Sequence, residues 1–412
     1  MSLLFHCSPS KLPRNYTMMT GPLVMAAIWT FRPVAAFVAP GTSVHYRRAY
    51  QRLWMASSSS ATISVDNNVS RMSVLQTLLS KHGAPGSRQC DQPNDLVPVT
   101  SLHETPELVS SMTGPDEQLS NLHPYLFPIA KSTSSGNYIC AYRNPFTEES
   151  DINHPWPIVE AQIGGPGMRL LALNSEHLMR RIACECDTDG SDASRTLVTL
   201  YNQDLGKGDL ASALDAPYQA GAVEQLGYGV DKYVLLRVGP FPDLYQTMAR
   251  QHAEKGDEQS SLIAAEAANG KLAGFGSTFR FYARLLASFP NRHEESRDAA
   301  RMCLRLPLTT IGMSMDDFRE VAVLGQLAEE QDSLKDTIAK LNDMYEKLRM
   351  AEQEEDGSKT PEQAAIDEAS YLMDQTALSG ARWSEIRPKL GTIFRSIDRV
   401  DMAKFVDLYS DK

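Results

Sequence analysis

The chain has 412 residues, 42% of them hydrophobic, and a formal net charge of −11. Six basic residues and no acidic residue precede Asp66, which leaves 34 of the 40 basic side chains and all 51 acidic ones in residues 66–412, a net charge of −17. That balance argues against binding to a nucleic-acid backbone, which needs a stripe of basic side chains. No apolar run after residue 66 reaches the length that spans a bilayer. The composition therefore predicts neither a nucleic-acid binder nor a transmembrane segment after residue 66, and the length allows two domains.

Residues 1–36 show the order of features that is typical of a secretory signal peptide. Basic residues come first, residues 23–31 form an apolar run of nine, and small residues occupy the third and first positions before Phe37. The run is too short to cross a bilayer but has the length of the apolar part of a signal. The sequence therefore predicts a signal peptide over residues 1–36, with cleavage between Ala36 and Phe37.

Residues 37–65 contain three Arg, six Ser, two Thr and no acidic residue, a composition typical of organelle transit peptides. The stretch AAFVAP at the predicted cut resembles the Phe-centred cleavage motif in the bipartite plastid-targeting presequences of algae with complex plastids. The resemblance covers about residues 17–65. It implies passage through the endoplasmic reticulum and then import into the plastid, with the stroma as the destination. The alternatives are a secreted protein and a disordered tail.

Residues 66–134 are predicted to form a short helix and a linker. Apolar residues recur at spacings of three and four over residues 66–82, and a glycine follows, as at the end of a helix. Residues 84–134 are rich in Pro, Ser, Gly, Asp and Gln and show no sustained period. They are therefore interpreted as a linker.

Residues 135–240 are predicted to form a small α+β domain. Short runs rich in β-branched and aromatic residues, separated by Gly and Pro, predict strands. The predicted strands cover residues 137–142, 157–162, 168–174, 196–202 and 231–238. Between the third and the fourth, helical spacing of apolar residues predicts a helix with Ser175 as its N-cap.

Residues 241–412 are predicted to form an all-α domain. The first predicted helices cover residues 243–255, 258–269, 277–289 and 294–305. They pair as helix, short turn, helix, and in this they resemble tetratricopeptide-type units only weakly, because no fixed period follows. The predicted fold class is therefore α+β, with a small domain of mixed helix and strand followed by an all-α helical domain with a long helical hairpin.

A long helix over about residues 314–352 carries the strongest signal for interaction. Leucines recur every seven residues, and the position three before each leucine is mostly apolar, as at the a and d positions of a coiled coil. The predicted interaction seam consists of Leu324, Leu327, Leu334, Ile338, Leu341, Tyr345 and Leu348. Two alternatives stay open: the helix pairs with residues 361–379 of the same chain, or it pairs with a partner protein or a second copy in a homodimer. Ser314 and Thr360 are predicted N-caps of the helices that follow them.

The sequence contains no motif of a serine hydrolase, a zinc protease or a Walker-type nucleotide site. The weak catalytic candidates are Glu160, which lies among apolar neighbours, Arg169 as its ion-pair partner, and His177. The glycine-rich residues 163–168 precede a predicted strand and not a helix, so they are interpreted as a turn instead of a phosphate loop.

Cys184 and Cys186 form a C-x-C pair inside a predicted helix. Residues two apart on a helix point about 200° apart, so the two thiols are not predicted to share a bond or a metal ion. Cys186 is assigned to the apolar face and Cys184 to the polar face. The sparse cysteines after residue 66 suit a reducing compartment. No metal and no cofactor is predicted.

The helix pairs, the heptad pattern and the lack of a catalytic motif together predict a non-catalytic plastid accessory or scaffold protein. It would contact other plastid proteins through helical surfaces, in the assembly of a larger complex. The alternative is an enzyme whose pocket lies between the two domains, near Glu160, Arg169 and His177. The sequence names neither the partner nor a substrate, and it does not choose between the stroma and the thylakoid surface.

Overall fold

The computed structural model describes residues 65–87, 95–99, 117–145, 156–203, 217–355 and 359–410. The predicted cleavage between Ala36 and Phe37, and the targeting segments on both sides of it, lie outside these ranges. Helix α2 (Val65–His82) opens the described part and confirms the helix predicted over residues 66–82. None of the helices in the described ranges combines the length and the apolar character that crossing a membrane requires.

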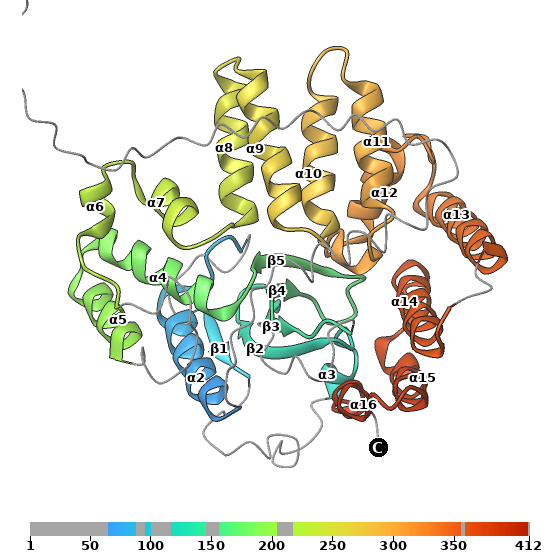
Figure 1. Cartoon of the computed structure of the whole chain (residues 1–412), viewed down its shortest axis with the longest axis horizontal. Coiled ribbons are helices and arrows are strands. Elements are labelled where there is room, and N and C mark those ends of the chain that lie inside the picture. The colour runs from blue at the N-terminus through green and yellow to red at the C-terminus, as the bar shows by residue number, and fades with distance from the viewer. Residues whose placement is uncertain are drawn as a thin grey trace, which may run out of the picture. The chain divides into compact units, whose positions relative to one another are not determined.

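Within the described residues the strands form one antiparallel sheet in chain order (Figure 1). The strands are β1 (Leu96–Pro98), β2 (Leu126–Ser132), β3 (Tyr138–Tyr142), β4 (Ile158–Ala161) and β5 (Met168–Ala172). The strands predicted over residues 137–142, 157–162 and 168–174 are confirmed as β3, β4 and β5. The segment interpreted as a linker, for which ordered patches were allowed, contains β1 and β2: β1 pairs with β2, and β2 pairs with β3.

The two faces of the sheet pack against different hydrophobic cores. In β3, Tyr138, Cys140 and Tyr142 face one core, while Ile139 and Ala141 face the other. All five residues of β3 are buried, because helices cover both faces of the sheet. This explains why the strand is apolar throughout instead of alternating between apolar and polar residues.

One core joins the sheet to the early helices. They are α2, α4 (Ser175–Asp189), α5 (Asp192–Gln203), α6 (Ala222–Leu226) and α7 (Val230–Arg237). Figure 1 shows these blue and green helices on the same side of the sheet. The predictions of strands over residues 196–202 and 231–238 were wrong, because α5 and α7 occupy these residues. Leu197, Val198 and Tyr201 are the buried residues of α5, and their spacing fits one face of a helix.

The other core joins the sheet to the later helices. They are α3 (Glu117–Ser120), α8 (Pro242–Glu254), α9 (Glu258–Lys271), α10 (Gly276–Ala287), α11 (His293–Cys303), the 3-10 turn η2 (Leu308–Thr310), α12 (Met315–Leu324), α13 (Leu334–Glu355), α14 (Pro361–Ser379), α15 (Trp383–Ser396) and α16 (Val400–Asp407). Helices α8 to α11, drawn in yellow and orange in Figure 1, confirm the four predicted between residues 243 and 305. The α+β fold class is therefore confirmed. The predicted domain boundaries concern which parts fold independently and stay predictions.

Local capping signals place several helix ends. Ser314 and Thr360 form the capping boxes predicted for them, with Asp317 and Gln363 as the reciprocal partners. The N-cap of α4 is Asn174 and not Ser175 as predicted, since the Asn174 side chain accepts a hydrogen bond from the third residue of the helix.

The continuous helix predicted over residues 314–352 was wrong. Helix α12 ends at Leu324, and α13 begins at Leu334. Gln326 adopts a left-handed conformation with φ of 56°, and the Leu327 N–H donates back to the Ala322 carbonyl over 2.9 Å. This is the geometry of a helix C-terminal Schellman turn, which stops the helix although the heptad pattern runs on.

Candidate functional site

Glu160 and Arg169 lie opposite each other on β4 and β5 and form an ion pair. Their side chains are 1% and 18% exposed. Asn137, just before β3, donates from Nδ2 to Glu160 Oε1 over 2.7 Å. Both carboxylate oxygens therefore have partners, as a buried charge requires. Arg169 is the partner predicted from the sequence, whereas a catalytic role for the pair stays a prediction.

His177 lies near the start of α4 and packs against Gly239. A Cβ atom on Gly239 would lie 2.6 Å from His177 Nδ1, so a glycine is needed for the ring to fit. Burial lowers the pKa of His177 to about 4, and its Nδ1 is buried without a hydrogen-bond partner in the structure. In the part of the chain that the structure describes, no hydrogen bond or ion pair joins His177 to Glu160 or Arg169. The predicted candidates therefore form a pair and a separate histidine.

A cavity of about 50 Å³ lies where β5 meets α8 and α10. Arg169 lines this cavity, but Glu160 and His177 do not. Pockets that enclose a metabolite-sized ligand have volumes of about 300–1,000 Å³. The cavity thus lies at the junction where a pocket was predicted, but it has room for only a small group.

The thiols of Cys184 and Cys186 are both buried in α4. Burial raises the pKa of each thiol to about 12, so neither carries the thiolate that redox or metal chemistry needs. The placement of Cys184 on the polar face was wrong: Arg180 and Tyr218, which stack 5.0 Å apart between guanidinium carbon and ring centre, shield that side of α4. Among the described residues no group of three or more His, Cys, Asp or Glu side chains is placed to hold a metal ion.

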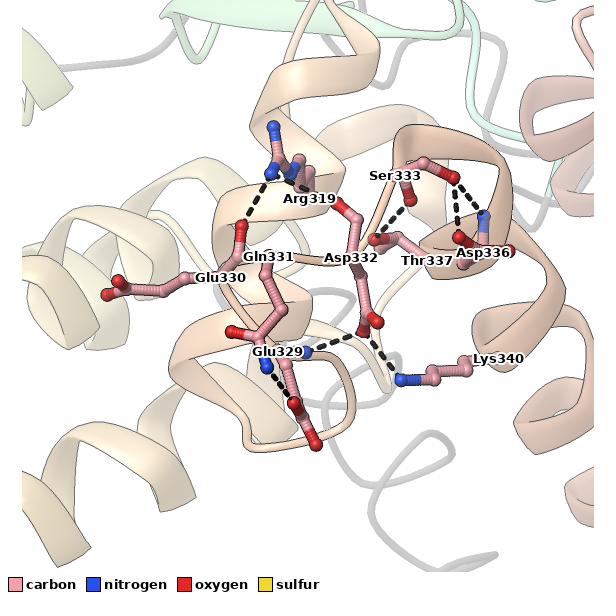
Figure 2. A network of polar contacts seen from close by, with 9 residues as sticks. All are labelled: Arg319, Glu329, Glu330, Gln331, Asp332, Ser333, Asp336, Thr337 and Lys340. Atoms are coloured by element: carbon pink, nitrogen blue, oxygen red, sulfur yellow. Dashed lines mark hydrogen bonds and ion pairs between the residues drawn. The ribbon is translucent and has the colours of Figure 1, made fainter.

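The turn between α12 and α13 is fixed by polar contacts (Figure 2). Arg319 of α12 reaches across the turn and donates from Nη2 to the carbonyls of Glu330 and Asp332 over 2.7 and 3.0 Å. The Asp332 carboxylate accepts from the Glu329 N–H over 2.7 Å and from Lys340 Nζ over 2.6 Å. The turn is therefore bonded on one side to Arg319 of α12 and on the other side to Lys340 of α13.

Ser333 starts α13 in the same network. Its hydroxyl accepts from the Asp336 N–H over 3.2 Å and donates to the Asp336 carboxylate over 2.6 Å, as Figure 2 shows. Thr337 donates from its hydroxyl to the Ser333 carbonyl over 3.1 Å. Ser333 therefore acts as an N-cap, which a continuous helix would not need.

The predicted seam residues divide into inner and outer groups. Leu341 and Tyr345 are buried in the chain's own core, and the Tyr345 hydroxyl donates to the Leu304 carbonyl over 2.5 Å. Four others are partly buried against that core: Leu324, Leu327, Ile338 and Leu348. Leu334 is 37% exposed. Helix α13 packs against α12 and α14 of the same chain, and contact with a partner protein stays a prediction for its outer face.

Comparison with known proteins places this chain among relatives. A protein of Arabidopsis thaliana named "Protein IN CHLOROPLAST ATPASE BIOGENESIS, chloroplastic" is 30% identical over 295 residues, which cover 70% of this chain and 79% of that protein. The chain belongs to this family. Two family models match as well, the PAB middle domain over residues 242–328 and the PAB C-terminal domain over residues 341–409. No solved structure matches the chain.

The family boundaries coincide with features of the fold. The PAB middle domain begins at the first residue of α8, close to the predicted boundary at residue 241. The two matched regions leave residues 329–340 between them, and these residues hold most of the network in Figure 2. The polar turn is therefore the connection between the two PAB domains.

Sequence reasoning missed the residues that join the PAB C-terminal domain to the sheet. Arg387 of α15 is fully buried and donates to the carbonyl of Ser120, the last residue of α3, and to that of Leu122, two residues further on. Trp383 donates from its indole N–H to the Gly165 carbonyl over 2.9 Å. Gly165 belongs to the turn predicted for residues 163–168, so a structural partner of that turn is now identified. The only sequence signal was an arginine within an otherwise apolar helix face.

Proposed function

We propose that this chain is a non-catalytic accessory protein of the plastid that acts in the assembly of the chloroplast ATPase. The observation that carries the proposal is the 30% identity to a protein named for chloroplast ATPase biogenesis, over 79% of that protein's length. The similarity extends over 295 residues, which is more than the part of the chain before residue 241 or the part after it. The matched region therefore includes residues on both sides of that boundary.

The interaction surface that we propose is the outer face of α13. Met350 is a large apolar side chain that is 61% exposed, and at about 100° per residue it lies roughly opposite the side of α13 that carries Leu334, Leu341 and Tyr345. The inner face of the same helix packs on the chain's own core through Leu341 and Tyr345. The heptad residues would thus serve the chain's own core, and Met350, which lies outside the heptad positions, would be left for a partner or a second copy.

The test is complementation of Arabidopsis thaliana plants that lack the relative. The chain, carrying a plastid address that the plant recognises, should restore the amount of assembled ATPase complex on native gels. Met350→Glu should fail to restore it if the outer face of α13 binds the partner. Ile263→Glu on α9, a side chain that is 59% exposed, is the matched control and should restore it. Failure of the unaltered, expressed chain would refute the assembly role.

Localisation is tested separately, because it depends on the presequence. We propose import into the plastid, with the stroma as the destination, through residues 1–65. Fusion of these residues to a fluorescent protein in an alga with a complex plastid should label the plastid, and Phe37→Ala should stop the fusion outside it. Secretion of both fusions would refute the bipartite signal.

A further inference from the structure

The cavity between β5, α8 and α10 has three guanidinium groups in its wall. Arg169 comes from β5, and Arg280 and Arg284 are separated by one turn on α10. Gln246 of α8 and Ser277 of α10 add an amide and a hydroxyl to the lining. The Arg280 side chain is only 8% exposed, so a nearly buried charge stands at this cavity.

Each of these three arginines forms an ion pair with a carboxylate. The pairs are Arg169 with Glu160, Arg280 with Asp317, and Arg284 with Glu320. None of these three carboxylates belongs to the residues that line the cavity. Asp243 does line it, but its two oxygens accept from Arg181 over 2.8 and 2.7 Å. The three arginines thus line the cavity, whereas the carboxylates that pair with them do not.

Two helices also begin at the cavity. Asp243 and Ser277 line it, and each is the second residue of its helix, α8 and α10. Backbone N–H groups in the first turn of a helix have no acceptor within the helix, and that end of the helix carries partial positive charge. Both effects add to the arginines and favour a negatively charged group.

We propose that this cavity binds one small oxyanion of the phosphate or sulfate class between Arg169, Arg280 and Arg284. Its volume of about 50 Å³ matches a single group of that size, and the remainder of any larger ligand would lie outside. Four arginines and five carboxylates, counting Arg181 and its second partner Glu185, lie in the cluster. Because the arginines already have partners, we expect a dissociation constant on the order of 1 mM. This site goes beyond the proposed assembly role and does not depend on it.

The test follows the melting temperature of the protein from residue 66 to the C-terminus in inorganic phosphate. A KCl series of equal ionic strength removes the general effect of salt. We expect a saturable rise in phosphate that KCl does not produce. Absence of that rise in the wild-type protein would overturn the proposal.

Variants locate the site. Gln246→Glu keeps the side-chain shape and puts a carboxylate at the cavity, and Arg284→Gln removes one guanidinium whose side chain is already 45% exposed. Each should weaken phosphate binding at least tenfold. Arg292→Gln is the matched control, because Arg292 is 37% exposed and pairs with Glu258 and Glu295 but does not line the cavity. Loss of binding in Arg292→Gln as large as in the other two variants would contradict the assignment.

A second arm separates the sources of the oxyanion. O-phosphoserine and adenosine monophosphate are added to the protein in the presence of phosphate, observed by phosphorus NMR. Displacement of phosphate by either compound would show that the cavity accepts the phosphoryl group of a larger molecule. Binding of phosphate without displacement would identify the free ion as the ligand.

Discussion

Replacement of Arg387 by methionine tests whether one side chain holds the PAB C-terminal domain against the sheet. Its guanidinium donates to the Ser120 carbonyl over 2.9 Å, to the Val406 carbonyl over 2.7 Å and to the Leu122 carbonyl over 2.5 Å. Methionine has a similar length, so the main loss is the donors and not the volume. Each buried carbonyl left without a donor costs about 1–3 kcal/mol.

An opposing effect decides the size of the loss. Burial of a guanidinium costs several kcal/mol, and methionine removes that cost. Three carbonyls at about 1–3 kcal/mol each outweigh it, and we expect Arg387→Met to lower the free energy of unfolding by about 2–4 kcal/mol. At no more than about 2–4 °C for each kcal/mol in a chain of this size, the melting temperature should fall by several degrees.

The assay is equilibrium unfolding in urea, with the midpoint and the slope compared between variants. Lys389→Met is the matched control on α15, because Lys389 is 59% exposed and lies 3.8 Å from Glu368. We expect the control to change stability by less than about 0.5 kcal/mol. A stability of Arg387→Met equal to or above that of the wild-type protein would refute the reasoning. It would mean that the free energy lost by burying the guanidinium charge exceeds the free energy gained from its hydrogen bonds.

Three other changes test single structural features. Burial, and then the charge of Arg387, lower the pKa of His123 to about 3, so the unfolded chain takes up the proton first. The contribution of His123 to stability is therefore full above pH 6.5 and falls by about 1.4 kcal/mol per pH unit between 6.5 and 3. His177, with its pKa lowered to about 4, adds a slope of the same sign, so His123→Gln should reduce the slope in urea titrations by the share of His123 and leave that of His177. Gln326→Gly, at a φ of 56°, should raise the free energy of unfolding by about 0.5–1 kcal/mol in the same assay, and an unchanged midpoint would argue against strain there. Gly167→Ala would bring a Cβ atom against the Thr309 carbonyl and should lower the melting temperature in calorimetry, whereas Gly270→Ala, with open space around it, should not.

The sequence predicted the elements whose signals are local. Apolar runs bounded by Gly and Pro identified β3, β4 and β5, and capping residues at Ser314 and Thr360 identified two helix starts. Strand β2 was not predicted because it contains Pro128. A proline is compatible with a strand only at an edge or at an irregular position, and the register shift between Pro128 and Ala130 is such a position. Helix α5 was taken for a strand because its threonines, valine and tyrosine are residues that favour strands.

The contacts around the sites depend on residues far apart in the chain. Arg387 donates to residues that precede it by more than 260 positions, and Arg169 meets Arg280 only where β5 meets α10. No spacing in the sequence carries such information. The pair of Glu160 and Arg169 was predictable because both residues lie on neighbouring strands, nine positions apart.

The heptad pattern shows why a correct period can predict the wrong element. Leucine spacing of seven continues through residues 324–348, yet Gln326 in a left-handed conformation and the N-cap Ser333 divide the helix. Two separate helices that pack on one core both need apolar residues at helical spacing, so the period survives the break between them. The signals that end and start a helix therefore outweigh the period. The break also falls between the two PAB domains, where Arg319 and Asp332 hold the turn with bonds that a straight helix would lack.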